Sequence, residues 1–381
     1  MKKVSCIIIC VLAMTALVSA GTWELAGDMI NGRQMHAAAF DPGTMTLYVI
    51  AGNVDVEFPE DLLGQYYDSV GVQYYKVTPG SPITIDAGAW GPSLSDFHVD
   101  CSGTVANVAC YNSDGAFIYN GRLYFTPANS NADTPWSFNK IVMTDIDTSG
   151  ALLGTWSLAG TPPVTTPGNV IFDCGWAVYG NRLYRVSGRE AAEGCTGGTA
   201  TYIAKVVSGE FQSDGTITNW RDEADLPVAT RWGTLQIVDG LAIYAGGTNA
   251  GGNISAVYVS DLGTNGEITS WVASANPMPV TCYMSSGCAN GSYIYVLTGR
   301  QDGTNGILNS YRAKVNVAGT DIDAWEAFAA VPYQNKYAAA CGGASFFFIT
   351  GGRDEKATGA PIVNDVYAMY DDTSVSDWTI Y

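Results

Sequence analysis

The chain has 381 residues, of which 47% are hydrophobic and 14% are charged, and its formal net charge is −18. A surface this acidic repels nucleic acid and anionic lipid, which excludes both as direct partners. The 12% aromatic residues and 44 glycines exclude a disordered chain and are typical of short strands joined by tight turns.

The first segment has the pattern of a signal peptide. Two lysines precede an apolar run at 4–18, which leads into the small residues Ser19-Ala20. We expect residues 1–20 to be removed and the mature protein to be secreted, into a periplasmic or extracellular space. The run is shorter than the roughly 20 residues that cross a bilayer, and nothing later is longer, so direct membrane insertion is not expected.

Four kinds of strand then recur in the same order along the chain. Six aromatic and β-branched segments that end near glycine predict buried strands entering loops; they are 47–53, 122–128, 182–189, 241–248, 293–300 and 346–353. A strand of small residues precedes each one, and a Tyr-bearing strand follows, such as AVYVSDL at 256–262. A Trp-bearing strand completes the unit, and this content fits the blades of a β-propeller.

Tryptophan marks the fourth strand of each unit. Phrases such as SDGTITNW at 213–220 and TNGEITSW at 264–271 begin with residues that tolerate positive φ, so each predicts a tight turn followed by a strand. Trp23 and Trp378 both lie in segments of this kind at opposite ends of the chain. Either segment could complete the last blade, and the sequence does not decide between them.

The glycine pairs Gly246-Gly247 and Gly351-Gly352, each followed by a Tyr and then a Trp, resemble kelch repeats. The first three units depart from this pattern, with Ala51-Gly52, Pro127-Ala128 and Ser187-Gly188 at the same place. The resemblance implies an all-β, six-bladed kelch-like β-propeller that spans residues 21–381 as a single domain. It has four antiparallel strands per blade, and the ring is closed by terminal strands.

Loop length distinguishes the two faces of such a ring. Turns between the first and second strands of a unit are short, whereas connections such as 53–71, 157–173 and 352–363 are long. Loops longer than closure requires are usually functional or variable. We therefore predict that the long-loop face is the working surface.

Several cations and aromatic residues are expected to meet on that face. Arg189, Arg300 and Arg353 end second strands, and Glu190 follows the first of them. The candidates at the starts of first strands are Arg33, His36, Arg231, Trp232, Tyr283 and Tyr337. Together they suit an anionic or sugar ligand through bidentate pairing and stacking. The alternative is that each Arg forms an intrachain bridge that orders its loop.

Nine cysteines become seven after Cys6 and Cys10 leave with the signal peptide. Export favours disulfide bonds, and the nearest pairs that bracket loop segments are Cys101 with Cys110 and Cys174 with Cys195. The sequence has no CxxC motif and no Cys/His cluster, so it predicts neither a metal site nor a cofactor.

The sequence predicts no catalytic residue. Copper oxidases that resemble galactose oxidase need two histidines, two tyrosines and a Cys–Tyr crosslink, but the histidines here, His36 and His98, do not sit in such a set. The leading hypothesis is an exported binding module for a glycan or an extracellular protein. The alternative is a metal-independent carbohydrate-active enzyme, such as a kelch-type sugar mutarotase or epimerase, using the three strand-end arginines and Glu190. The oligomeric state is left open.

Overall fold

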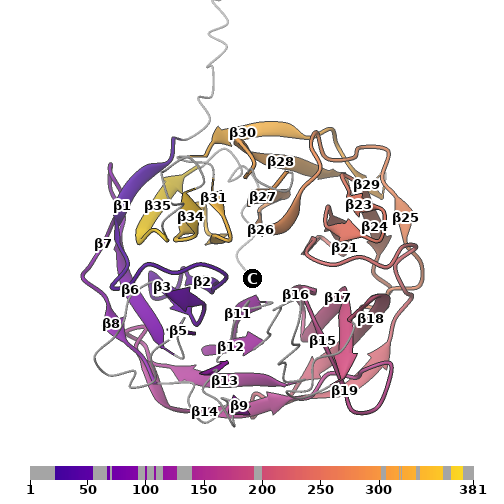
Figure 1. The fold of residues 1–381 in the computed structure, drawn as a ribbon, viewed down its shortest axis with the longest axis horizontal. Coiled ribbons are helices and arrows are strands. Elements are labelled where there is room, and N and C mark those ends of the chain that lie inside the picture. The colour runs from indigo at the N-terminus through magenta and orange to yellow at the C-terminus, as the bar shows by residue number, and fades with distance from the viewer. Residues whose placement is uncertain are drawn as a thin grey trace, which may run out of the picture.

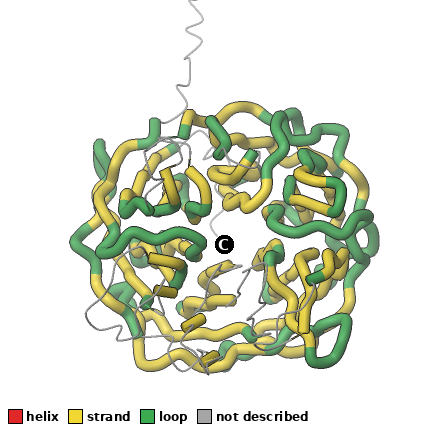
Figure 2. Tube along the Cα trace, in the orientation of Figure 1, coloured by secondary structure: helices red, strands yellow, loops and turns green. Residues whose placement is uncertain are grey.

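Six antiparallel β-sheets surround a common axis, so the protein is an all-β, six-bladed propeller, as predicted (Figure 1). The computed structural model of the protein describes residues 22–54, 67–68, 71–92, 99–100, 107–108, 115–126, 140–192, 200–301, 306–316, 318, 320–331, 335–354 and 362–371. These residues form strands, turns and loops (Figure 2), and among them there is no helix long and apolar enough to cross a membrane. The predicted signal peptide lies outside the described residues and stays a prediction.

In each of the first three blades, the four main strands follow one another in chain order from the axis outward. Blade one holds β2 (Ala37–Asp41), β3 (Thr46–Ile50) and β6 (Val72–Thr78), with β7 (Thr84–Ile85) and β8 (Ala89–Trp90) both paired to β6. Blade two holds β11 (Gly115–Tyr119), β12 (Arg122–Thr126), β13 (Ile141–Ile146) and β14 (Leu152–Gly160). Blade three holds β16 (Gly175–Tyr179), β17 (Arg182–Ala192), β18 (Thr201–Phe211) and β19 (Ile217–Asp222), and β15 (Asn169–Phe172) pairs with the far end of β17.

The last three blades repeat this plan. Blade four holds β20 (Thr234–Val238), β21 (Leu241–Ala245), β24 (Val257–Asp261) and β25 (Val272–Ala273). Blade five holds β26 (Tyr283–Asn290), β27 (Tyr293–Arg300) and β28 (Asn309–Asn316), with β29 (Asp321–Ile322) and β30 (Glu326–Ala330) both paired to β28. Blade six holds β32 (Ala339–Gly343), β33 (Phe346–Thr350), β35 (Asp365–Tyr370) and β1 (Glu24–Asp28).

Four short strand pairs lie in the connections between these strands. They are β4 (Asn53–Val54) with β5 (Tyr67–Asp68), β9 (Val99–Asp100) with β10 (Asn107–Val108), β22 (Thr248–Asn249) with β23 (Gly252–Asn253), and β31 (Asn335–Lys336) with β34 (Arg353–Asp354).

The ring is closed by the N-terminal strand. β1 pairs antiparallel with β35, with Glu24 opposite Ala368 and Leu25 opposite Tyr367. The outermost strand of blade six thus comes from one end of the chain and its other strands from the opposite end, which confirms closure by terminal strands. Trp23, next to β1, is buried. Trp378 lies outside the described residues.

The backbone repeats even where the double glycine does not. Ala51 and Ser187 have φ of 59° and 65°, close to the 69° of Gly246 and the 54° of Gly351 at the matching position of other blades. Non-glycine residues in this left-handed region carry a strain of about 1 kcal/mol or more. Blades one and three therefore keep the geometry of the repeat without its glycine.

In blades three, four and six, the residue after this left-handed position joins its blade to the next. Its backbone N–H donates to the carbonyl of a residue just before the next innermost strand. The bonds are Gly188 to Thr230 at 2.8 Å, Gly247 to Cys282 at 2.6 Å and Gly352 to Arg33 at 2.6 Å. The last of these joins blade six to blade one, so the same contact recurs across the closure.

Tryptophans of the outer strands form a second set of links between blades. The indole N–H groups donate to backbone carbonyls of the preceding blade's connection: Trp156 to Pro92 at 2.9 Å, Trp271 to Ala224 at 2.9 Å and Trp325 to Asn276 at 3.1 Å. Each bond satisfies the polar end of a large, largely apolar side chain. Three of the recurring tryptophans therefore tie neighbouring blades together at the rim, whereas the buried indole N–H groups of Trp23 and Trp220 have no hydrogen-bond partner among the described residues.

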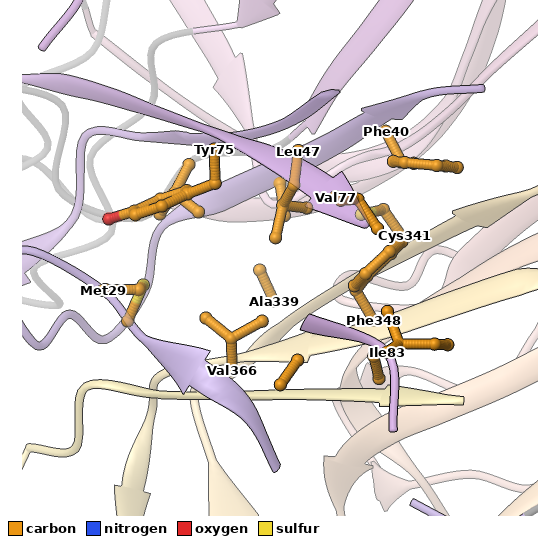
Figure 3. Packing of buried hydrophobic residues seen from close by; sticks show 14 residues of the cluster. Met29, Phe40, Leu47, Tyr75, Val77, Ile83, Ala339, Cys341, Phe348 and Val366 are labelled. Carbon is orange, nitrogen blue, oxygen red and sulfur yellow. The ribbon is translucent and has the colours of Figure 1, made fainter. Parts of the chain in front are cut away.

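The hydrophobic core lies between neighbouring blades. Between blades one and six, Leu47, Tyr75, Phe348 and Val366 are completely buried, and the rings of Phe40 and Phe348 lie 4.8 Å apart (Figure 3). Burying a side chain such as Leu or Phe contributes roughly 1.5 to 3 kcal/mol. Packing between facing blades thus helps to hold the ring together.

The cysteines are described only in part. Cys282, Cys288 and Cys341 carry free thiols, and Cys174 is buried. No disulfide joins two of the described cysteines. The partner predicted for Cys174, Cys195, and both members of the pair Cys101 and Cys110 lie outside the described residues, so these two pairs stay predictions.

Candidate functional site

A channel runs along the axis between the innermost strands. At the long-loop face it begins in a cavity of about 90 Å³, which we call the mouth cavity. The residues around the mouth cavity that matter below are Met35, His36, Asp173, Trp232, Met284 and Tyr337. A second cavity of about 150 Å³ shares His36 with the first, and a third of about 410 Å³ follows toward the short turns.

A buried charge cluster lies at the edge of the mouth cavity. Oδ2 of Asp173 accepts a hydrogen bond from Nε of Arg189 at 2.7 Å and one from Nη1 of Arg231 at 3.2 Å. The side chain of Asp173 is fully buried, and those of Arg189 and Arg231 are 8% and 15% exposed. Burial lowers the pKa of Arg231, and the carboxylate of Asp173 opposes that shift. The two guanidinium groups and one carboxylate together carry a net charge of +1.

Aromatic rings continue from this cluster around the mouth. The guanidinium carbon of Arg231 lies 3.4 Å from the centre of the Trp232 ring, and Trp232 lies 5.8 Å from the ring of Tyr283. The guanidinium carbon of Arg300 then lies 5.3 Å from Tyr283 and 5.4 Å from Tyr337. Arg300 also donates from Nη1 to the Tyr337 hydroxyl at 3.2 Å.

These contacts cross four blades without a break. Blade three provides Arg189, blade four provides Arg231 and Trp232, blade five provides Tyr283 and Arg300, and Tyr337 precedes the innermost strand of blade six. We call these six residues together with Asp173 the mouth arc. The structure therefore brings six of the predicted site residues into one continuous set of contacts.

His36 lies beside the arc but is held as a neutral group. Its Nε2 lies 2.7 Å from the Thr350 hydroxyl, and burial, assisted by the nearby Arg33 cation, lowers the pKa of His36 to about 3. Its Nδ1 is buried, and within the described part of the chain it has no hydrogen-bond partner. At neutral pH His36 thus offers an uncharged ring to both the mouth cavity and the cavity below it.

Arg33 lies deeper than expected. It is completely buried, and its Nη1 donates to the carbonyls of Ala51 at 2.6 Å and Gly71 at 3.0 Å. Burial lowers the pKa of Arg33 to about 10, which leaves it a cation at neutral pH. Arg33 orders the ends of the connection between β3 and β6, and it does not line the mouth cavity.

Glu190 also takes a different role from its neighbour. Its carboxylate accepts hydrogen bonds from the backbone N–H groups of Thr165 and Thr166, at 3.0 and 2.8 Å, and from the Thr165 hydroxyl. The buried Glu190 therefore fixes the turn before β15 and is not paired with Arg189. This use of the carboxylate gives no support to a role as an acid or base.

Arg353 is the predicted residue that the structure leaves apart. It lies in β34 opposite Lys336 of β31, on the long-loop side of blade six, and it does not line the mouth cavity. The three strand-end arginines of the sequence therefore do not form one set. Arg189 and Arg300 belong to the mouth arc, and Arg231 completes it.

Asp173 is not among the predicted site residues, because it lies at the end of the connection predicted at 157–173. Phe172-Asp173-Cys174 occupies the same place before its innermost strand as Arg231-Trp232-Gly233 does in blade four. Aligning the units at the first strand, instead of at the glycines that end the second, could have identified Asp173. The same alignment would have found Met35 and Met284.

The described residues contain no group of three or more His, Cys, Asp or Glu side chains that could hold a metal ion. No protein-family model matches the chain, and a search of curated proteins finds no match either. The lining of the mouth cavity includes the faces of Trp232 and Tyr337 and the buried carboxylate of Asp173. The guanidinium groups of Arg189, Arg231 and Arg300 lie behind this lining, in contact with those residues. Such a site suits the binding of a polar ligand with an apolar face.

Proposed function

We propose that this protein is an exported, kelch-like binding propeller that recognises a glycan through the mouth cavity on its long-loop face. The observation that carries the proposal is the mouth arc. Trp232 and Tyr337 line the opening, and Arg189, Arg231, Tyr283 and Arg300 join them behind it in one chain of contacts.

The chemistry of the arc matches that of a sugar. A sugar ring has an apolar face that packs on aromatic rings, and hydroxyl groups that accept hydrogen bonds from guanidinium groups and donate to carboxylates. Trp232 and Tyr337 are half-buried at the mouth, so parts of their rings can be reached from outside. Asp173 fixes Arg189 and Arg231 in place, which reduces the entropy lost when a ligand binds.

The charge of the arc stands out against the rest of the chain. The whole protein has 36 acidic and 18 basic residues, yet Arg189, Arg231 and Arg300 meet at the mouth. Such a local concentration of cations attracts ligands that accept hydrogen bonds or carry negative charge. This favours a glycan, and an acidic one above all.

The shape of the site favours a glycan over a protein partner. A stable protein interface buries about 800 Å² on each partner. The mouth arc surrounds a cavity of about 90 Å³ instead, and that cavity opens directly into the channel below. A small ligand or the end of a chain fits such a concave site better than a protein surface does.

A glycan array with site variants tests the proposal. Trp232→Ala removes the aromatic face and Arg300→Ala removes a guanidinium, and each should weaken binding of any array hit by tenfold or more. Arg122→Ala is the matched control, because Arg122 pairs with Asp145 beside the short turn of blade two. Thermal unfolding of each variant separates lost binding from lost folding. Absence of any hit, or hits that folded site variants bind as well as the wild type, would overturn the proposal.

A further inference from the structure

Five residues at the mouth share one unusual backbone conformation. Four of them lie two residues before the innermost strand of their blade, and Met284 is the second residue of the innermost strand of blade five. Each has a positive φ in the left-handed region. They are Met35 at 54°, Asp173 at 63°, Trp232 at 61°, Met284 at 50° and Tyr337 at 66°. All five line the mouth cavity. We call them the left-handed ring.

Glycine would adopt this conformation without strain, yet none of the five residues is glycine. At the end of the second strand the left-handed position is glycine in blades four and six, at Gly246 and Gly351, and a small residue in blades one and three, at Ala51 and Ser187. At the mouth, all five left-handed positions carry side chains, although a side chain raises the conformational energy of the backbone there. Strain of this kind tends to collect at functional sites.

Core packing does not account for these side chains. Met35 and Met284 belong to none of the hydrophobic clusters formed by the described residues, and they are half-buried at the cavity wall. Asp173 is charged, and Trp232 and Tyr337 are only partly buried. The side chains of the ring therefore converge on the cavity from five blades, one side chain from each.

The ring surrounds an axial hole and not a groove. A groove can hold the middle of a polymer, whereas a hole at the centre of a ring admits only an end. Trp232, Tyr337 and the two methionines offer apolar walls, and Asp173 lines one side. Arg189 and Arg231 lie behind Asp173 and share its carboxylate, so the three groups together carry a net charge of +1. Nη2 of Arg189 is buried, and among the described residues it has no hydrogen-bond partner. That donor needs an acceptor, and a carboxylate is the strongest one.

We propose that the left-handed ring determines specificity by receiving the terminal sugar of a glycan end-on, and that this sugar carries a carboxylate held on the Arg189 and Arg231 side. This inference rests on the proposed function and names the ligand class of the same site. The carboxylate can belong to a hexuronic acid or to a nine-carbon acidic sugar, and the probes below distinguish these two sources.

Glycine substitutions test the ring because they remove a side chain and relieve strain at the same time. The double variant Met35→Gly with Met284→Gly should lose at least fivefold in affinity while its melting temperature stays unchanged or rises by about 2 °C. Asp239→Gly is the control, because Asp239 has φ of 50° in an exposed turn on the opposite face. It should show the same thermal behaviour with unchanged affinity. Unchanged affinity of the double variant would overturn the role of the ring.

Calorimetry with defined ligands tests the carboxylate. The probes are a trigalacturonate, a sialyl-lactose, and the carboxyl-reduced form of each. We expect one acidic probe to bind and its reduced form to bind at least tenfold more weakly. Equal binding of an acidic probe and its reduced form, lost in Trp232→Ala, would overturn the acidic ligand but leave glycan binding intact. Binding of no glycan at all would overturn both.

Discussion

Oδ2 of Asp173 lies 2.7 Å from Nε of Arg189, with both side chains almost completely buried at the mouth of the channel. Arg231 shares the same carboxylate oxygen at 3.2 Å. Asp173→Asn would leave two guanidinium groups next to each other with no negative charge between them. Removing one member of a buried ion pair costs roughly 3 to 5 kcal/mol. We expect a loss of this size in the free energy of unfolding, measured by urea denaturation.

A surface pair provides the comparison for that measurement. Asp222 lies 2.8 Å from Lys205, but its side chain is 69% exposed. Exposed pairs contribute about 1 kcal/mol or less, so Asp222→Asn should hardly shift the urea midpoint. If the two variants unfolded at the same urea concentration, Asp173 would not have the buried electrostatic role described above.

Much of the fold could be predicted from the sequence, because its determinants are local and repeated. Turn residues such as Asp239-Gly240 need no distant partner to form a hairpin. The apolar composition of strands such as the one ending at Ala245 is enough to predict that they are buried. The sequence predicted closure by a terminal strand but not which one, because Trp23 and Trp378 lie in equivalent sequence contexts. Pairing between β1 and β35 is a contact between distant parts of the chain, and local sequence does not encode it.

The site was predicted less completely than the fold. Position along the strand placed Arg189, Arg300 and Trp232 at the correct face, because the ends of strands map directly onto faces of the ring. Side-chain partners did not follow from sequence neighbours, since Arg189 pairs with Asp173 across 16 residues and not with the adjacent Glu190. Neighbouring residues in a strand point to opposite faces, which separates their side chains.

The close approach of the Arg231 backbone to Gly247 within blade four can be tested with alanine. Gly247 has φ of 103°, and a Cβ there would lie 2.7 Å from the carbonyl oxygen of Arg231. Gly247→Ala thus adds both backbone strain and a clash with main-chain atoms, which should cost about 3 kcal/mol or more in unfolding free energy. Urea denaturation measures this loss.

Gly252→Ala is the matched control, because Gly252 has φ of 114° but no atom within 4 Å of the added Cβ. It should show the strain alone, about 1 kcal/mol. Equal losses for the two variants would mean that the contact between Gly247 and Arg231 does not limit which residue can stand there.

Buried thiols should be chemically silent in the folded protein. Burial raises the pKa of Cys282 to about 12, and it raises that of Cys341 as well. The thiolate is the reactive form, so alkylation of Cys282 at pH 8 should be slower than in the unfolded chain by on the order of a thousandfold. Peptide mass mapping after iodoacetamide treatment, with and without urea, measures this. Fast labelling of the folded protein at Cys282 would contradict its burial.

The same mapping without reduction addresses the predicted disulfide bonds. Export would place the chain in an oxidising compartment, where Cys101 should pair with Cys110 and Cys174 with Cys195. Peptides joined in these two combinations are the expected result. If both pairs were found reduced in exported protein, the prediction of two disulfide-closed loops on the long-loop face would be wrong.

His36 should make stability depend on pH in mildly acidic solution. Its pKa is about 3 in the folded protein against 6.5 for an ordinary histidine, so the unfolded chain takes up the proton first as the pH falls. The contribution of His36 is complete above pH 6.5 and is lost between there and about pH 3, by up to about 1.4 kcal/mol per pH unit. Between pH 8 and pH 5 the wild type should therefore lose about 2 kcal/mol more unfolding free energy than His36→Gln. His98→Gln leaves His36 in place and should follow the wild type, whereas parallel curves for the wild type and His36→Gln would show that His36 is not held neutral.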